Sequence, residues 1–315
     1  MIVNPAAGRG TAARALREVR NAFCQRTQIV FRETVSAGDE ENIAADALDA
    51  GAEIIVCVGG DGTCTKVARI ILRRGSTCAL AVVPAGTGND FAKTLGLQGM
   101  SLPDLAALLD GRPQKIDVGR AHDQYFLNSC GFGFDAAVLE ASIGVRWLRG
   151  NAVYLYAAVK QLFTYSGLDV SADDFARDLS RMLMVTVSNG QWLGGAFHIA
   201  PNASPTDGRL DIALIRNSGV VERALLFMNA TRGTHVGRSS VKQMQLPEVT
   251  FNFSSPPTME IDGELHFAKS STVTIQCIPR ALSVIAAPGA LDTRRRDNDL
   301  VARSAEWSAS PSRRA

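Results

Sequence analysis

A chain of 315 residues, 46% hydrophobic and 20% charged, is long enough to bury a large core, and its length predicts two globular domains. A formal net charge of only +2 excludes the strongly basic surface that nucleic acid favours, so no nucleic-acid partner is expected. No uncharged apolar run reaches the roughly 18 residues of a membrane span.

The cysteines and the N-terminal residues bear on the compartment. The cysteines are scattered with no CxxC pair, at positions Cys24, Cys57, Cys64, Cys78, Cys130 and Cys277. This scatter favours reduced thiols over a disulfide framework or a zinc site. Met1 leads directly into an apolar residue with no basic segment before it, so no signal peptide is expected. We therefore expect a cytoplasmic protein.

The first third of the chain alternates strand-like and helix-like patterns. Strands are predicted over 2–3, 28–32, 53–58 and 79–83, and helices over 11–23, 39–50 and 65–73. Strands separated by helical segments imply parallel pairing, with ligands bound at the carboxyl ends of the strands. The pattern predicts an α/β domain with a Rossmann-like parallel sheet over residues 1–113.

After residue 113 the pattern changes to short apolar runs bounded by turn residues. Strands are predicted over 115–121, 125–129, 182–188, 196–200, 210–215, 248–253, 258–261 and 272–278, and helices over 147–165 and 220–231. Many short strands with turn signals favour an antiparallel β-sandwich, predicted over 114–289, whose end is expected to return to the first domain. The Arg-rich residues 290–315 are predicted to be disordered.

Glycine-bearing turns follow the predicted strands of the first domain. The run Gly59-Gly60-Asp61-Gly62-Thr63 joins a buried strand to a helix, and glycine lets a polyanion approach the backbone N–H groups and the helix N-terminus closely. A glycine-rich turn with an N-capping Asp61 is the alternative. The turns at 4–10 and 84–90 fall on the same sheet edge, so all three are expected to converge on one ligand.

Three separated motifs then match one family in order. Asn4-Pro5-Ala6-Ala7-Gly8, Gly59-Gly60-Asp61-Gly62-Thr63 and Pro84-Ala85-Gly86-Thr87-Gly88-Asn89-Asp90-Phe91-Ala92 resemble the nucleotide-binding loops of the diacylglycerol kinase catalytic domain, as found in bacterial lipid kinases and sphingosine kinases. Ser188-Asn189-Gly190, Asp207-Gly208-Arg209 and Ile261-Asp262-Gly263-Glu264 are similar to later blocks of that family. The likeness covers residues 1 to 289.

The resemblance implies transfer of the γ-phosphoryl group of ATP to a hydroxyl of a diacylglycerol-like lipid, with ATP and Mg²⁺ as cofactors and the active site between the two domains. By the same likeness the ATP site comprises Asn4, Pro5, Ala6, Ala7, Gly8, Thr34, Gly59, Gly60, Asp61, Gly62, Thr63, Cys64, Thr65, Thr87, Asn89 and Asp90. NAD kinases share the glycine loop, so a kinase of a soluble substrate is one alternative. A catalytically weak protein that binds lipid or nucleotide is another.

Carboxylates supply the predicted catalytic groups, because phosphoryl transfer needs magnesium ligands and a group that accepts the hydroxyl proton. The resemblance favours Glu264 with Asp262 as the base over Asp61, and the choice among the three stays open. Gly263 between the first two would let both carboxylates approach one hydroxyl from an extended run. An ordinary hairpin turn with solvated acids is the alternative.

A second loop resembles a structural magnesium site of some bacterial members. There the metal would be bound by the Asp207 carboxylate and by the main-chain carbonyls of Ser204 and Arg209, and a plain β-turn is the alternative. Asp135 falls where sphingosine kinases place an acid near the lipid head group, and helix capping is the alternative for this residue.

The chain departs from the family pattern at two places. Thr65-Lys66 stands where an Asn-Glu pair is usual, and Gly38-Asp39-Glu40 stands where Gly-His-Ala is common. Lys66 would then contact ATP phosphates or be a solvated helix residue. These departures bear on nucleotide affinity and not on the fold.

Aromatic and basic residues alternate over 147–165, a composition suited to the bilayer interface. A core-packed amphipathic helix is the alternative. We expect peripheral contact with a lipid substrate at the inner face of the membrane, and whether the chain forms a homodimer is left open.

Overall fold

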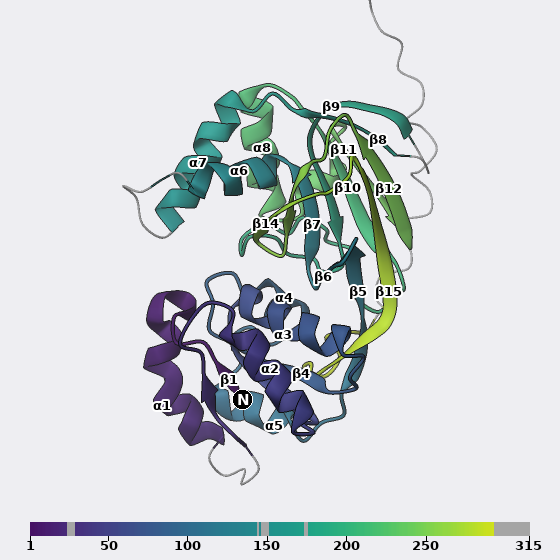
Figure 1. The fold of residues 1–315 in the computed structure, drawn as a ribbon. Helices are drawn as coiled ribbons and strands as arrows, with labels where there is room; N and C mark the ends of the chain where they lie inside the picture. The colour runs from purple at the N-terminus through teal and green to yellow at the C-terminus, as the bar shows by residue number, and fades with distance from the viewer. Residues whose placement is uncertain (24–28, 144, 146–150, 173–175, 293–315) are drawn as a thin grey trace, which may run out of the picture.

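The computed structural model describes residues 1–23, 29–143, 145, 151–172 and 176–292. Within them the chain forms two halves, one below the other in Figure 1, joined by a single hydrogen-bonded sheet. None of the described helices combines the length and the apolar character that crossing a membrane requires.

The first half is a parallel sheet flanked by helices. Its strands are β1 (Ile2–Val3), β2 (Arg32–Glu33), β3 (Ile54–Gly59) and β4 (Ala79–Pro84), in the order β4-β3-β1-β2. Its helices are η1 (Ala7–Gly10), α1 (Thr11–Phe23), α2 (Asp39–Asp49), α3 (Asp61–Arg73), α4 (Asp90–Thr94) and α5 (Leu102–Leu108). Residues 55–59 of β3 are all buried, as expected of a central parallel strand covered on both faces. The predicted α/β class is confirmed.

The second half is antiparallel except where it meets the first. Its strands are β5 (Gln114–Ala121), β6 (Gln124–Phe126), β7 (Ser129–Gly133), β8 (Leu168–Ala172), β9 (Ala176–Ser188), β10 (Leu210–Arg216), β11 (Val241–Leu246), β12 (Glu248–Phe253), β13 (Thr258–Ile261), β14 (Glu264–Phe267) and β15 (Thr272–Val284). Its helices are α6 (Phe134–Ile143), α7 (Asn151–Thr164), α8 (Val220–Ala230) and η2 (Thr234–Gly237). The sheet runs β14-β13-β7-β9-β8-β12-β15, which confirms the predicted antiparallel class.

Strand β15 belongs to both halves. It pairs antiparallel with β5 and β12, and its last residues Ser283 and Val284 pair in parallel with Ala79 and Leu80 of β4. Figure 1 shows β15, in yellow, passing from the upper sheet into the lower half. The register shifts between Ile278 and Leu282, where the chain turns toward the first half. The domain limits at residues 113 and 289 stay predictions.

One predicted helix start and one predicted strand near the glycine turns differ from the structure. Helix α3 begins at Asp61 rather than at Thr65, because Gly60 is extended (φ −99°, ψ −171°) and ends the strand at once. The strand predicted over 196–200 is wrong. Gly194 and Gly195 at positive φ turn the chain back, so only one isolated bridge forms, between Leu193 and Phe197.

Several elements were absent from the prediction, including α4, α5, α6, β8, β11 and β14. Of the strand predicted over 28–32, only Arg32 is in β2, and residue 28 lies outside the described part. The start of the helix predicted over 147–165 and the tail from residue 293 also lie outside it.

Candidate active site

The three glycine turns of the first half lie side by side. Asn4 Nδ2 in the first turn donates to Thr63 Oγ1 in the second at 3.0 Å. The Phe91 N–H after the third turn donates to Asp61 Oδ1 in the second at 2.9 Å. The turns are thus bound to one another through side chains that the motifs supply.

Glycine is required where these turns touch. A Cβ on Gly86 would lie 2.4 Å from Gly60 Cα, and a Cβ on Gly59 would lie 2.8 Å from Thr63 Cβ. A Cβ on Gly88 would lie 3.0 Å from Asp61 Oδ2 and 3.5 Å from Gly195 Cα of the second half. Because no side chains intervene, the backbone at the start of α3 forms a cradle in which N–H groups and a helix N-terminus can receive a polyanion.

Two acids stand beside this cradle. Burial, and then the charge of neighbouring Asp90, raises the pKa of Asp61, while the Phe91 N–H opposes the rise. Asp90 accepts from Lys93 Nζ and from Gly195 N, both at 2.9 Å, so it connects α4 to a loop of the second half. Lys93 Nζ also donates to Gly195 O at 2.5 Å and lies 4.9 Å from the Trp192 ring centroid.

Asp262 is buried and saturated with donors. Its carboxylate accepts from the N–H groups of Leu127, Asn128 and Ser129 at 2.7, 2.8 and 3.0 Å, and from Thr65 Oγ1 at 2.8 Å. Only 7% of the residue is exposed. Burial raises the pKa of Asp262, and these donors oppose that rise. The carboxylate therefore joins α3 of the first half to the β6–β7 connection of the second.

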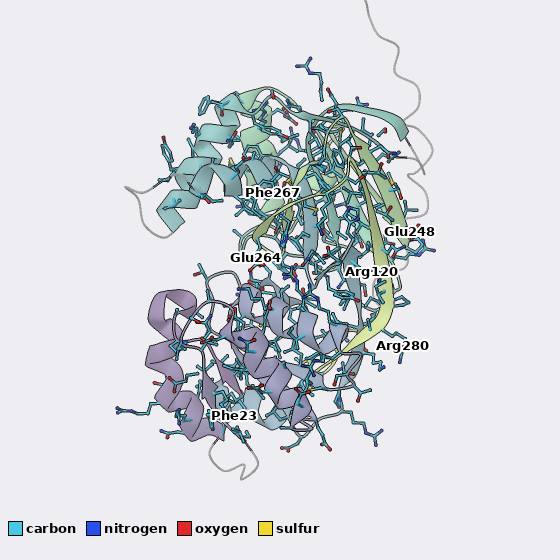
Figure 2. The ribbon with its side chains drawn as sticks, viewed as in Figure 1. Phe23, Arg120, Glu248, Glu264, Phe267 and Arg280 are labelled. Carbon is cyan, nitrogen blue, oxygen red and sulfur yellow. The ribbon has the colours of Figure 1, made fainter. Side chains whose placement is uncertain are left out.

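Glu264 is the first residue of β14 and lies where the two halves face each other (Figure 2). Its carboxylate is 3.3 Å from Arg69 Nη1 and 3.5 Å from Lys66 Nζ, and its side chain is 37% exposed. Ile261 pairs with Glu264, so Asp262 and Gly263 are the turn of a hairpin, both at positive φ (48° and 85°). The expected extended run is therefore wrong. One carboxylate is buried and the other is partly exposed.

The two departures from the family pattern contact each other. Lys66 Nζ lies 3.0 Å from Glu40 Oε1, and Glu40 is only 4% exposed. Lys66 also contacts Glu264, so it is neither a solvated residue nor free to serve phosphates alone. An acid on α2 thus supplies the partner for a cation on α3.

Two more acids are buried behind Asp262 and were not predicted as a pair. Asp135 is the second residue of α6, and its Oδ1 accepts from the N–H of the next residue, Ala136, at 2.7 Å, whereas Oδ2 is buried without a hydrogen-bond partner. Burial raises the pKa of Asp135 to about 7. Burial, and then the Asp135 charge, raises the pKa of Glu260 well above its usual value, and Glu260 Oε2 also has no partner.

The other residues predicted for the ATP site differ in their burial and contacts. Asn4 Oδ1 accepts from Ala6 N at 3.1 Å, which holds the turn from Asn4 to Gly8 closed, and Thr34 N donates to Val3 O at the edge of that turn. Thr87 is exposed. The Cys64 side chain is buried against Cys57, 3.6 Å between sulfurs, so it faces the core rather than the cradle.

The loop predicted to bind magnesium is held by a residue that the sequence did not single out. The buried Asp117 accepts from Gly208 N at 2.7 Å and from Arg280 N at 2.8 Å. Asp207 Oδ1 accepts from Arg209 N, and burial followed by the charge of Asp117 raises the pKa of Asp207. Ser204 Oγ lies 3.2 Å from Thr206 Oγ1. Across the described residues, no three His, Cys, Asp or Glu side chains form a metal-binding group, so this site stays a prediction.

Lys93 was also missed. It follows Asp90 by three residues, a helical spacing that does predict an ion pair once α4 is recognised. Asp117 offers no such signal, because its partners lie 91 and 163 residues away in the chain.

Fold and site together define a class: a protein with an α/β half whose glycine turns adjoin an antiparallel half. Residues 1–121 match the diacylglycerol kinase catalytic domain, and residues 128–286 match the YegS C-terminal NAD kinase beta sandwich-like domain.

Relatives and solved structures agree with these matches. A YegS-like lipid kinase of Pseudomonas putida is 32% identical over 256 residues, covering 80% of this chain and 83% of its own. A diacylglycerol kinase of Bacillus subtilis is 26% identical over 270 residues, covering 84% and 88%. The crystal structure of a diacylglycerol kinase from Bacillus anthracis shares the fold, with a TM-score of 0.72 at 22% identity, covering 91% and 96%. The chain belongs to the diacylglycerol kinase family and is a lipid kinase.

Lys66 and Glu40 are expected to be coupled in stability. Lys66→Met leaves the buried Glu40 carboxylate without its cation, which should cost about 1–3 kcal/mol of unfolding free energy. Lys66→Met combined with Glu40→Gln should cost less than the sum of the two single changes. Urea unfolding of the four proteins measures the coupling. The exposed pair Arg74–Asp49 is the matched control and should couple by less than about 1 kcal/mol. Additive effects of the Lys66 and Glu40 changes would show that the two side chains do not stabilise each other.

Asp135 is expected to make stability depend on pH. With a folded pKa of about 7 against an unfolded value near 3.8, folded Asp135 binds more protons than the unfolded residue between those values. Stability should therefore fall as pH rises from about 4 to 7, and Asp135→Asn should remove that part of the fall. Melting temperatures across this range, compared with the exposed control Asp46→Asn, measure the effect. Parallel curves for wild type and Asp135→Asn would contradict it.

Proposed function

We propose that this enzyme transfers the γ-phosphoryl group of ATP to a hydroxyl of a diacylglycerol-like lipid, giving phosphatidic acid or an analogue. One observation carries the proposal. The glycine cradle around Asp61 faces the hairpin that bears Glu264, with Asp262 bonded to Thr65 across the same boundary. A phosphate donor in the cradle would thus stand opposite an acid of the other half. The names of the relatives support a lipid acceptor.

The residues fit ATP with Mg²⁺. The glycines at 59, 60, 86 and 88 leave the backbone bare, as close approach of a polyphosphate requires. The charge of neighbouring Asp90 contributes to the raised pKa of Asp61, after burial. Two neighbouring carboxylates are a donor set that suits a hard divalent cation. Mg²⁺, when bound, would neutralise phosphate charge. Asp61 and Asp90 are the residues that would hold it.

Glu264 is the proposed proton acceptor. Its carboxylate is partly exposed at the junction and forms ion pairs with Lys66 and Arg69. A carboxylate in this position can accept a proton from an alcohol. Asp262 has every oxygen engaged by donors, so its role in this proposal is to position the 127–129 segment and Thr65. The lipid hydroxyl would give its proton to a Glu264 oxygen as the hydroxyl oxygen attacks the γ-phosphorus. The bond from that phosphorus to the bridging oxygen would break, and ADP would leave.

We also propose that the enzyme works in the cytoplasm at the inner face of the membrane. Helix α7 carries Tyr156, Val159 and Phe163 exposed along one face, and α8 carries Val221, Leu225 and Met228 in the same way. Apolar side chains at helical spacing on a surface favour contact with lipid.

The decisive assay presents the enzyme with radiolabelled ATP, Mg²⁺ and a panel of lipids in mixed micelles. Label is expected in the lipid fraction, with diacylglycerol preferred over sphingosine and monoacylglycerol. NAD is included because the matched C-terminal domain is described as NAD kinase-like. Asp61→Ala, checked for folding by circular dichroism, should abolish most transfer. Label on NAD with none on lipid would overturn the proposal in favour of a soluble substrate.

Substitutions of the two hairpin acids, Glu264 and Asp262, are expected to have different effects. Glu264→Gln should lower kcat by about 10²–10⁴-fold with little change in melting temperature, because a general base is lost from a partly exposed site. Asp262→Asn should lower both kcat and the melting temperature, because an amide cannot accept from all four donors. Since both act on one step, the double variant should fall little below Glu264→Gln. Near-normal kcat in Glu264→Gln at saturating ATP and lipid would show that Glu264 is not the base and would favour Asp61 in that role.

A further inference from the structure

A cavity of about 820 Å³ opens in the second half, away from the candidate active site. It lies where the end of α7 and the start of α8 meet β9 and β10, and its lining includes Arg181, Arg216, Arg223, Ser218, Gly219 and Leu179. Nothing in the proposed reaction uses these side chains.

The register of β9 and β10 gives the distance between the cavity and the candidate active site. Arg216 pairs with Met182 at one end of the β9–β10 ladder, and Asp211 pairs with Ser188 at the other. Next to Ser188, Asn189 Nδ2 donates to Leu127 O, beside the Asp262 site. Six residues of β9 therefore separate the cavity from the active site, about 20 Å at strand rise.

The floor of the cavity holds a buried positive charge. Arg223 is 7% exposed and donates to Leu162 O, Tyr165 O, Ser218 O and Asn217 Oδ1 at 2.7–3.0 Å. All of these acceptors are uncharged, and among the described residues no carboxylate forms an ion pair with this guanidinium. A buried charge balanced only by dipoles leaves a positive field over the cavity.

The walls add further donors. Arg181 and Arg216 line the cavity and have exposed side chains, and the Arg181 N–H donates to Asp169 at the rim. Helix α8 begins at the cavity with Gly219 as its N-cap and no side-chain cap bond. Ser218 Oγ, also in the lining, is buried and lacks a hydrogen-bond partner. An uncapped helix N-terminus, an orphaned hydroxyl and arginines are together the donor set of an anion site.

We propose that this cavity binds a phosphate group, carried by a soluble phosphate or by a phospholipid head group. Guanidinium forks match phosphate oxygens in a bidentate way, which favours phosphate over a simple halide. Helix α8 begins beside the cavity, and its second residue, Val221, is exposed, so a head group at a membrane surface is one source of the phosphate and a soluble molecule is the other.

The test compares wild type with Arg181→Asn/Arg216→Gln. Asn suits residue 181, whose φ is 53°. The matched control is Arg280→Asn/Arg232→Gln: Arg280 is exposed at φ 51°, and Arg232 is exposed beyond the other end of α8. Calorimetric titration with sodium phosphate at constant ionic strength is one arm. Sedimentation with phosphatidylcholine vesicles, with or without phosphatidic acid, is the other. Kinase turnover on micellar lipid should stay normal in all three proteins.

We expect phosphate binding to be at least about tenfold weaker in the cavity variant and unchanged in the control. Only the cavity variant loses charge-assisted bonds to the phosphate. A loss confined to phosphatidic acid vesicles assigns the site to a lipid head group, and a loss in the phosphate arm assigns it to soluble phosphate. Equal binding by all three proteins in both arms overturns the proposal. If the double variant unfolds, Arg216→Gln alone against Arg232→Gln decides by the same criteria. The active-site cradle contributes equally throughout, so the comparison reports the cavity.

Discussion

The hydrogen bonds to the Asp262 carboxylate are the interaction on which the contact between the two halves depends. It receives three N–H groups from the 127–129 segment and the Thr65 hydroxyl of α3, a residue 197 positions earlier in the chain. A buried carboxylate is stable only when donors replace its lost water, so its burial and its bonds require each other. The left-handed conformation of Asp262 aims the side chain inward. Glu264, two residues on, is thereby left partly exposed.

The acids near the junction of the two halves differ in burial. Burial raises the pKa of Asp135 and of Glu260, whereas the Glu264 side chain is 37% exposed beside two cations. Exposure decides which acid can serve chemistry, because a general base must come within hydrogen-bond reach of the substrate hydroxyl. The Lys66–Glu40 contact shows how the chain keeps the local charge balanced where its motif departs from the family.

Much of this could be predicted from the sequence, and the limits have physical causes. The parallel half followed from alternating patterns and glycine turns, which are local signals. Helix α3 began earlier than predicted because apolar spacing does not register Asp61-Gly62-Thr63 as a first turn. The separation of Asp262 from Glu264 depended on a two-residue turn rather than an extended run. The partners of Asp117 lie too far along the chain for any local pattern to reveal.

Strand β15 also has a mechanical consequence. Its ladder with β5 ties the halves together as a narrow ribbon, interrupted only where the register shifts between Ile278 and Leu282. Arg280, in the left-handed region, is anchored there by Asp117. Ladder bonds on either side resist bending, so any swing of one half against the other concentrates its torsion in those few residues. The hairpin of β13 and β14, which carries Asp262 and Glu264, is not part of this segment, so torsion there leaves the pairing of the hairpin unchanged.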